Sequence, residues 1–180
     1  MKRLVGLAFV MLGLSLSSTL AQAEVTLAAF EGVWEGTAVS ENNTSVNFAI
    51  TSRDMDVEIR PKTDKSFSIT WRTLQRQEGQ PGMPDEVLKE TTRTYTPAQD
   101  KNVWHDTSKG NLLSGDTVSW AVLKGQKLTI YSMATNKKGG YDMLIYGRTL
   151  TGLGMKLDFK AIRDGQERRT ATGTLIKSGK

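Results

Sequence analysis

The residues that most often do acid–base or metal chemistry are scarce in this chain, which contains one histidine, His105, and no cysteine. A Ser-His-Asp arrangement would have to combine His105 with Asp106, its neighbour in the sequence. Neighbouring residues on a strand point to opposite faces, so Asp106 is badly placed to orient the imidazole. A zinc site needs several imidazole or thiolate ligands, which a single histidine does not supply. We therefore expect no catalytic residue and no metal site.

Carboxylates form one regular row, in which Asp54, Asp56 and Glu58 alternate with Met55 and Val57. Alternation places the three acids on one face of a strand and the apolar side chains on the other. A calcium-binding loop needs a turn glycine among its ligands, and this row contains none. A solvated strand surface therefore explains the acids, and we expect the protein not to be an enzyme.

The remaining candidates are large apolar side chains, which recur at alternate positions in many segments. Small-molecule pockets are lined mainly by such side chains, with few polar groups among them. The candidate ligand-binding residues are Phe48, Ile59, Phe67, Ile69, Trp71, Trp104, Trp120, Ile130 and Phe159. Large indole rings are also able to fill a small interior completely, so a cavity and a filled core both remain open.

Period-two alternation dominates the chain after its first residues and indicates strands with one dry face and one wet face. Examples are residues 30–38, 66–72, 118–122 and 155–161. Short turns that contain glycine separate these runs, and no stretch of ten residues has helical periodicity. Consecutive strands joined by short turns predict an antiparallel up-and-down order.

The need to protect the edges of such a sheet favours its closure into a barrel. A sheet of about eight to ten strands must protect its edges, and closure into a barrel removes them. The predicted fold class is therefore all-β, an up-and-down antiparallel β-barrel of about 8 to 10 strands. We expect one domain over residues 24–180. A two-sheet sandwich is the alternative.

One long segment lacks strand character. Residues 75–86 contain two prolines, two glycines and almost no apolar side chain, which predicts a hairpin loop from Arg76 to Glu86. Long loops in compact domains are often lids over a site. The loop 76–86 is therefore a candidate lid, and a plain surface excursion is the alternative.

The N-terminus has the pattern of an export signal. A basic head and an apolar run from Leu4 to Leu16 precede Ala21 and Ala23, two small residues in signal-peptidase spacing. The pattern predicts that residues 1–23 are a signal peptide cut after Ala23, and that the protein is periplasmic or secreted. An uncleaved anchor is the alternative, although the run is shorter than the roughly 20 residues that a membrane span needs. No later segment is apolar enough to span a membrane.

The charge balance excludes one class of partner. The chain has 24 Lys and Arg residues against 19 Asp and Glu residues, for a formal net charge of +5. This mild excess forms no basic helix or stripe, so we expect no nucleic-acid partner. Nothing in the sequence predicts an oligomeric state.

The start of the first predicted strand resembles a known motif. Gly32-Val33-Trp34 is similar to the Gly-x-Trp of the lipocalin and calycin superfamily. The resemblance implies that Trp34 follows a short helical turn and packs across the closed base of a barrel. It also implies an arginine from the last part of the barrel stacked over the indole, for which Arg168 and Arg169 are the candidates.

Two glycines flank this tryptophan on the same strand face. We expect Gly32 and Gly36 to leave room for the indole of Trp34 and to let the strand bend. Some small bacterial β-barrels with a similar Gly-x-Trp-x-Gly start bind haem through a histidine near their C-terminus. This chain has no histidine there, so we expect no cofactor.

These features together predict an exported, lipocalin-like barrel that binds or carries a small apolar ligand in the cell envelope. The alternative is a non-enzymatic interaction module with a filled barrel. Such a module would dock on an envelope partner through its outer face or through the 76–86 loop.

Overall fold

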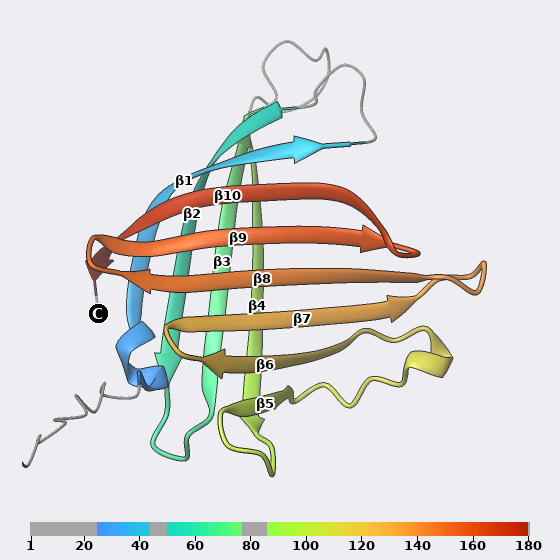
Figure 1. Cartoon of the computed structure of the whole chain (residues 1–180), viewed down its shortest axis with the longest axis horizontal. Helices are drawn as coiled ribbons and strands as arrows, with labels where there is room; N and C mark the ends of the chain where they lie inside the picture. Colours follow the sequence, from blue (N-terminus) through green and yellow to red (C-terminus); the bar gives the residue numbers. More distant parts are fainter. Residues whose placement is uncertain (1–24, 44–49, 77–85, 180) are drawn as a thin grey trace, which may run out of the picture.

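The computed structural model describes residues 25–43, 50–76 and 86–179. Within these residues, ten strands form one closed antiparallel barrel, accompanied by two short 3₁₀ helices (Figure 1). The elements are η1 (Leu27–Phe30), β1 (Gly32–Asn42), β2 (Ile50–Pro61), β3 (Phe67–Arg76), β4 (Glu86–Pro97), β5 (Val103–Asp106), η2 (Leu112–Ser114), β6 (Val118–Lys124), β7 (Lys127–Thr135), β8 (Tyr141–Thr151), β9 (Gly154–Arg163) and β10 (Gln166–Gly179). Neither of the two helices in this described part of the chain is long and apolar enough to cross a bilayer.

The strand order is the simplest one for a barrel. Each strand pairs antiparallel with the next in sequence, and β1 pairs with β10 to close the ring. Closure gives the first and last strands a partner on both sides, so the sheet has no exposed terminal edge. The predicted up-and-down barrel is therefore confirmed, with ten strands, and the two-sheet sandwich is wrong. This architecture is compatible with a calycin-like fold.

The shortest strand pairings of the barrel are those of β5. This strand pairs with β4 only over Tyr95–Pro97 and with β6 only over Trp120–Val122. In Figure 1, β2 to β4 run up the page and β6 to β9 run across it, so two curved layers cross around a common interior. The candidate site lies in that interior.

Trp34 and η1 close one end of the barrel. The indole of Trp34 is 5 % exposed, and its Nε1 donates a hydrogen bond of 2.9 Å to the carbonyl oxygen of Phe30. Phe30 is the last residue of η1 and is completely buried. Both the short helical turn before the first strand and the buried indole at the barrel base are as expected from the sequence.

The cation over this indole is not an arginine. The Nζ atom of Lys177 lies 5.5 Å from the centre of the Trp34 ring, so the expectation for Arg168 or Arg169 is wrong. The antiparallel register explains the difference, because β10 pairs Lys177 with Trp34 and Arg169 with Asn42. The two arginines therefore lie near the opposite end of the barrel from Trp34.

The glycines beside Trp34 are required for another reason than the one expected. Gly32 has a φ of +121°, and a Cβ there would lie 2.5 Å from the carbonyl oxygen of Gly179. A Cβ on Gly36 would clash with the carbonyl oxygen of Thr174. The backbone of β10 approaches β1 closely at both positions, so it is this strand, and not the indole, that excludes side chains.

Aromatic side chains fill the interior next to this end. Phe67 stacks on Tyr95, with ring centres 5.0 Å apart, and meets Trp104 edge to face at 5.7 Å. Trp104 Nε1 donates to the carbonyl oxygen of Lys65, and the Tyr95 hydroxyl lies 2.8 Å from Ser119 Oγ. The same core includes Val57, Ile59, Ile69, Leu123, Leu128, Ile130, Met155 and Leu175. We call this region, together with Trp34 and η1, the closed half.

Candidate functional site

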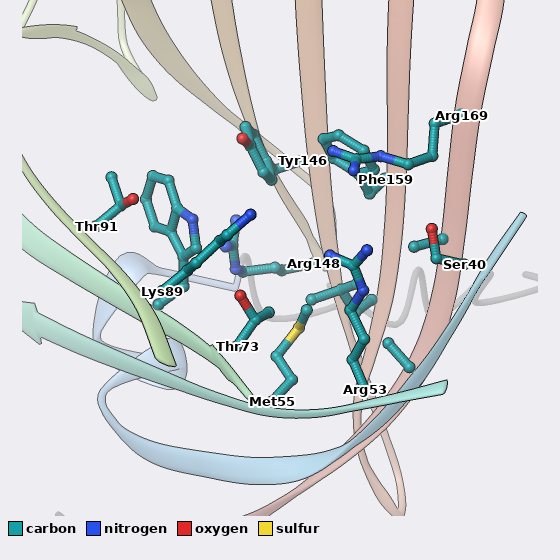
Figure 2. Close-up of a pocket in the computed structure, with 14 residues that line it drawn as sticks. Ser40, Arg53, Met55, Thr73, Lys89, Thr91, Tyr146, Arg148, Phe159 and Arg169 are labelled. Atoms are coloured by element: carbon teal, nitrogen blue, oxygen red, sulfur yellow. The ribbon is translucent and has the colours of Figure 1, made fainter. Parts of the chain in front are cut away.

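The other part of the interior, which we call the open half, contains a cavity of about 220 Å³. Side chains from β1, β2, β3, β4, β8, β9 and β10 surround it (Figure 2). The lining residues are Ala38, Ser40, Arg53, Met55, Trp71, Thr73, Lys89, Thr91, Tyr146, Arg148, Leu157, Phe159, Arg169 and Ala171. A wider hollow of about 600 Å³ has Arg169 in common with this cavity.

One side of the cavity is an aromatic wall. Tyr146 lies between Trp71 and Phe159, with ring centres 5.2 Å and 4.9 Å away, respectively. Leu157 and Met55 add aliphatic surface. Burial raises the pKa of the Tyr146 phenol, so this hydroxyl is neutral at ordinary pH. The wall offers the mainly apolar surface that small-molecule pockets usually have.

Arg148, on β8, is the least expected residue of the cavity. Its side chain is 1 % exposed, and its Nε and Nη1 atoms have no hydrogen-bond partner among the described residues. The guanidinium carbon lies 5.6 Å from the Trp71 ring centre and 5.8 Å from that of Tyr146, within the range of cation–π attraction. Burial lowers the pKa of Arg148 to about 10, which leaves the group charged at neutral pH.

Two further arginines enter the cavity from β2 and β10, the strands on either side of β1. Burial, followed by the charge of Arg169, lowers the pKa of Arg53 on β2. The Arg53 Nε is buried and has no hydrogen-bond partner within the described part of the chain. Arg169, on β10, lies over the ring of Phe159 at 5.2 Å. Two like charges therefore act on each other on this side of the cavity.

No carboxylate occurs among the described residues that line the cavity, although Lys89 adds a fourth cation. Two arginines elsewhere have carboxylate partners. Arg93 in the interior pairs with Asp106 at 2.8 Å, and Arg72 on the outer face pairs with Asp56 at 3.1 Å. The cavity thus combines an aromatic wall with an uncompensated positive charge.

The predicted ligand-binding residues separate into two groups. Trp71 and Phe159 line the cavity. The others that face the interior belong to the closed half and do not reach it: Ile59, Phe67, Ile69, Trp104 and Ile130. Phe48 lies outside the described residues, as do the predicted signal peptide and residues 77–85 of the 76–86 loop.

Trp120 is not in the interior. Its ring stacks on Tyr131 with centres 5.1 Å apart, while Ser119, Ala121 and Leu123 are the buried residues of β6. The expectation that Trp120 faces inward is therefore wrong. Both faces of β6 are largely apolar, so alternation along this strand did not reveal which face is inside.

His105 and Asp106 point to opposite faces, as the strand geometry predicts. His105 is exposed, and its Nε2 lies 3.0 Å from Thr96 Oγ1, whereas Asp106 binds Arg93. Within the described residues, no group of three or more His, Cys, Asp or Glu side chains is arranged to hold a metal ion.

Sequence reasoning missed the cations of the cavity, although a signal was present. Arg148 continues a row of apolar residues, Leu144 and Tyr146, at alternate positions of one strand. Arg53 continues the row of Met55 and Val57 in the same way. A charged residue in phase with an apolar row indicates a charge directed into the interior.

No protein-family model matches the chain, and a search of curated proteins finds no match. The fold is therefore assigned by its architecture alone, and the function must be inferred from the cavity and its residues.

Proposed function

We propose that this protein binds and carries a small, largely apolar molecule in the open half of its barrel, as an exported lipocalin-like carrier of the cell envelope. The observation that supports this best is the cavity of about 220 Å³ beside the aromatic wall of Trp71, Tyr146 and Phe159. A barrel filled by its own side chains would have no such space. The signal-peptide pattern of residues 1–23 supports export.

The aromatic wall is well suited to a flat or flexible apolar body. Ring faces supply a large apolar contact area and have few torsions to immobilise on binding. The closed half stabilises the site, because its packed aromatic rings fix the positions of the strands that continue into the open half.

Uptake of a neutral fluorescent dye such as Nile red tests the proposal. The wild-type protein should bind the dye with a blue-shifted, enhanced emission, because the dye moves from water to an apolar wall. Trp71→Ala should weaken binding about tenfold or more, since a large aromatic contact is lost.

Trp120→Ala is the matched control, because it removes the same ring from the outer face and should leave dye binding unchanged. If the wild type takes up no dye, or if both variants lose binding equally, the cavity is not the binding site.

The interaction module is the second candidate function. Its supporting observation is the apolar surface on the outer face, where Leu88 is 61 % exposed, Val39 is 45 % exposed and Trp120 stacks on Tyr131. Native mass spectrometry of protein purified gently from its own compartment separates the two functions. A co-purifying small mass supports the carrier, whereas a bare chain without dye uptake supports the module.

A further inference from the structure

We infer that the molecule bound in the open half is an amphipathic anion, whose carboxylate, phosphate or sulfate group is held by Arg148 and whose apolar body lies along the aromatic wall. The inference rests on the proposed carrier function and specifies the class of its ligand. Arg148 binds the head group, and Arg53 and Arg169 add positive charge on the side of the cavity that is nearer the open end of the barrel.

Arg148 presents buried donors that the described residues do not satisfy. A guanidinium has five N–H donors in its plane, and buried donors nearly always have partners. The rings of Trp71 and Tyr146 contact its cationic centre but do not accept the in-plane N–H groups of Nε and Nη1. An oxyanion at either edge of the guanidinium would accept from one of these two donors together with Nη2, which is the two-pronged geometry that arginine prefers.

Among the described residues, no carboxylate lines the cavity to balance its arginines. A buried cation without a counter-charge is strongly unfavourable, and the chain pairs its other interior arginine, Arg93, with Asp106. Among the described residues, no carboxylate inside the cavity pairs with Arg53, Arg148 or Arg169. The proximity of Arg53 and Arg169 adds repulsion that lowers the pKa of Arg53. A bound anion is the partner that Arg148 lacks in this arrangement.

The positions of the arginines along the barrel axis determine how the ligand is oriented. Arg148 pairs with Leu157 across β8 and β9, two register pairs closer to the closed half than Tyr146 and Phe159. Arg53 and Arg169 lie toward the opposite end, beside Ala38 and Asn42 of β1. The head group therefore reaches the floor of the cavity, while the tail passes the aromatic wall toward the wider hollow at Arg169.

Matched amphiphiles test the inference by isothermal titration calorimetry: decanoate, decyl phosphate, decyl sulfate, decanol and decylammonium, all below their aggregation concentrations. At least one anion should bind about tenfold or more tightly than decanol, because it adds charge-assisted hydrogen bonds to the same chain. Decylammonium should bind more weakly than decanol. The three anions distinguish a carboxylate ligand from a phosphate or sulfate ester.

Variants assign the head group to a residue. Arg148→Met should abolish the preference for the anion over decanol, and circular dichroism with denaturant unfolding of the variant shows whether the barrel still folds. Arg148→Lys keeps the charge and should retain part of the preference. Arg60→Met removes an arginine from the exposed face of β2, where it pairs with Glu58, and should change nothing.

The two proposals fail differently. If wild-type protein binds Nile red and decanol as tightly as the anions, the ligand is neutral and only the present inference is wrong. If it binds neither the dye nor any amphiphile, the carrier function itself is wrong. If Arg148→Met keeps the full anion preference, Arg148 does not hold the head group.

Discussion

The closed and open halves of the barrel use polar groups in opposite ways. In the closed half, Trp34 Nε1, Trp104 Nε1 and the Tyr95 hydroxyl each have a hydrogen-bond partner. In the open half, Arg53 and Arg148 keep buried donors without partners in the described part of the chain. The difference separates two tasks: one half supplies the packing that holds the fold, and the other accepts an unfavourable arrangement that a ligand would compensate.

Removing Trp34 should have the largest effect on stability. Trp34→Ala should lower the free energy of unfolding by about 3–5 kcal/mol, because it leaves a large void and removes the seal of the closed half. Trp71→Ala, which enlarges a space already present, should cost clearly less. Denaturant unfolding followed by circular dichroism measures both, and equal losses would contradict the division into two halves.

Alkaline pH should weaken the closed half through Tyr95. Burial raises the pKa of Tyr95 to about 12, above its ordinary value of 10, so the folded state holds this proton more tightly than the unfolded state. The resulting stability is complete below pH 10 and is lost as the pH rises to about 12, an effect of about 2–3 kcal/mol.

Tyr95→Phe should remove that pH dependence. The comparison is best made in an Arg148→Met background, because burial lowers the pKa of Arg148 to about 10 and its deprotonation acts in the opposite direction. Denaturant midpoints measured across this range provide the test. Parallel profiles for the Tyr and Phe proteins would show that Tyr95 is not protected.

Arg148→Met should stabilise the protein in the absence of ligand, by about 1–3 kcal/mol. The variant replaces a buried, unpaired charge with an apolar side chain of similar length, a type of change that is often favourable. An increase in the denaturant midpoint together with the loss of anion binding would show that function is maintained at the expense of stability. A large decrease would show that Arg148 has a structural role instead.

His105→Ala should have the smallest effect. The side chain is exposed on the outer face, bonded only to Thr96 Oγ1 in the described structure, and belongs to neither half. We expect a change of less than about 0.5 kcal/mol in stability and no change in ligand binding. A loss of binding would reopen a role for the only histidine.

Local patterns in the sequence predicted the framework well. Alternation and glycine turns indicated consecutive antiparallel strands, and the Gly-x-Trp start indicated the buried Trp34. Properties that depend on register or on distant residues were not predicted. Lys177, and not Arg169, reaches the indole because the length of β10 sets which residue opposes Trp34.

The candidate site was predicted only in part, for related reasons. Trp71 and Phe159 were identified by their size and phase, but Trp120 was misplaced because β6 is apolar on both faces. The lack of a carboxylate among the described residues that line the cavity becomes evident only when seven strands are brought around it. Alternation indicates which way a residue points, but not what it meets.

The position of the chain end has a practical consequence. The last strand finishes beside the start of the first strand, where Gly179 pairs with Val33. An affinity tag, a fluorophore or a surface tether attached at this end would sit against the sealed side. Tethered molecules would then expose the open end of the barrel to solution. This orientation favours attachment through the C-terminal strand in immobilised capture assays and biosensors.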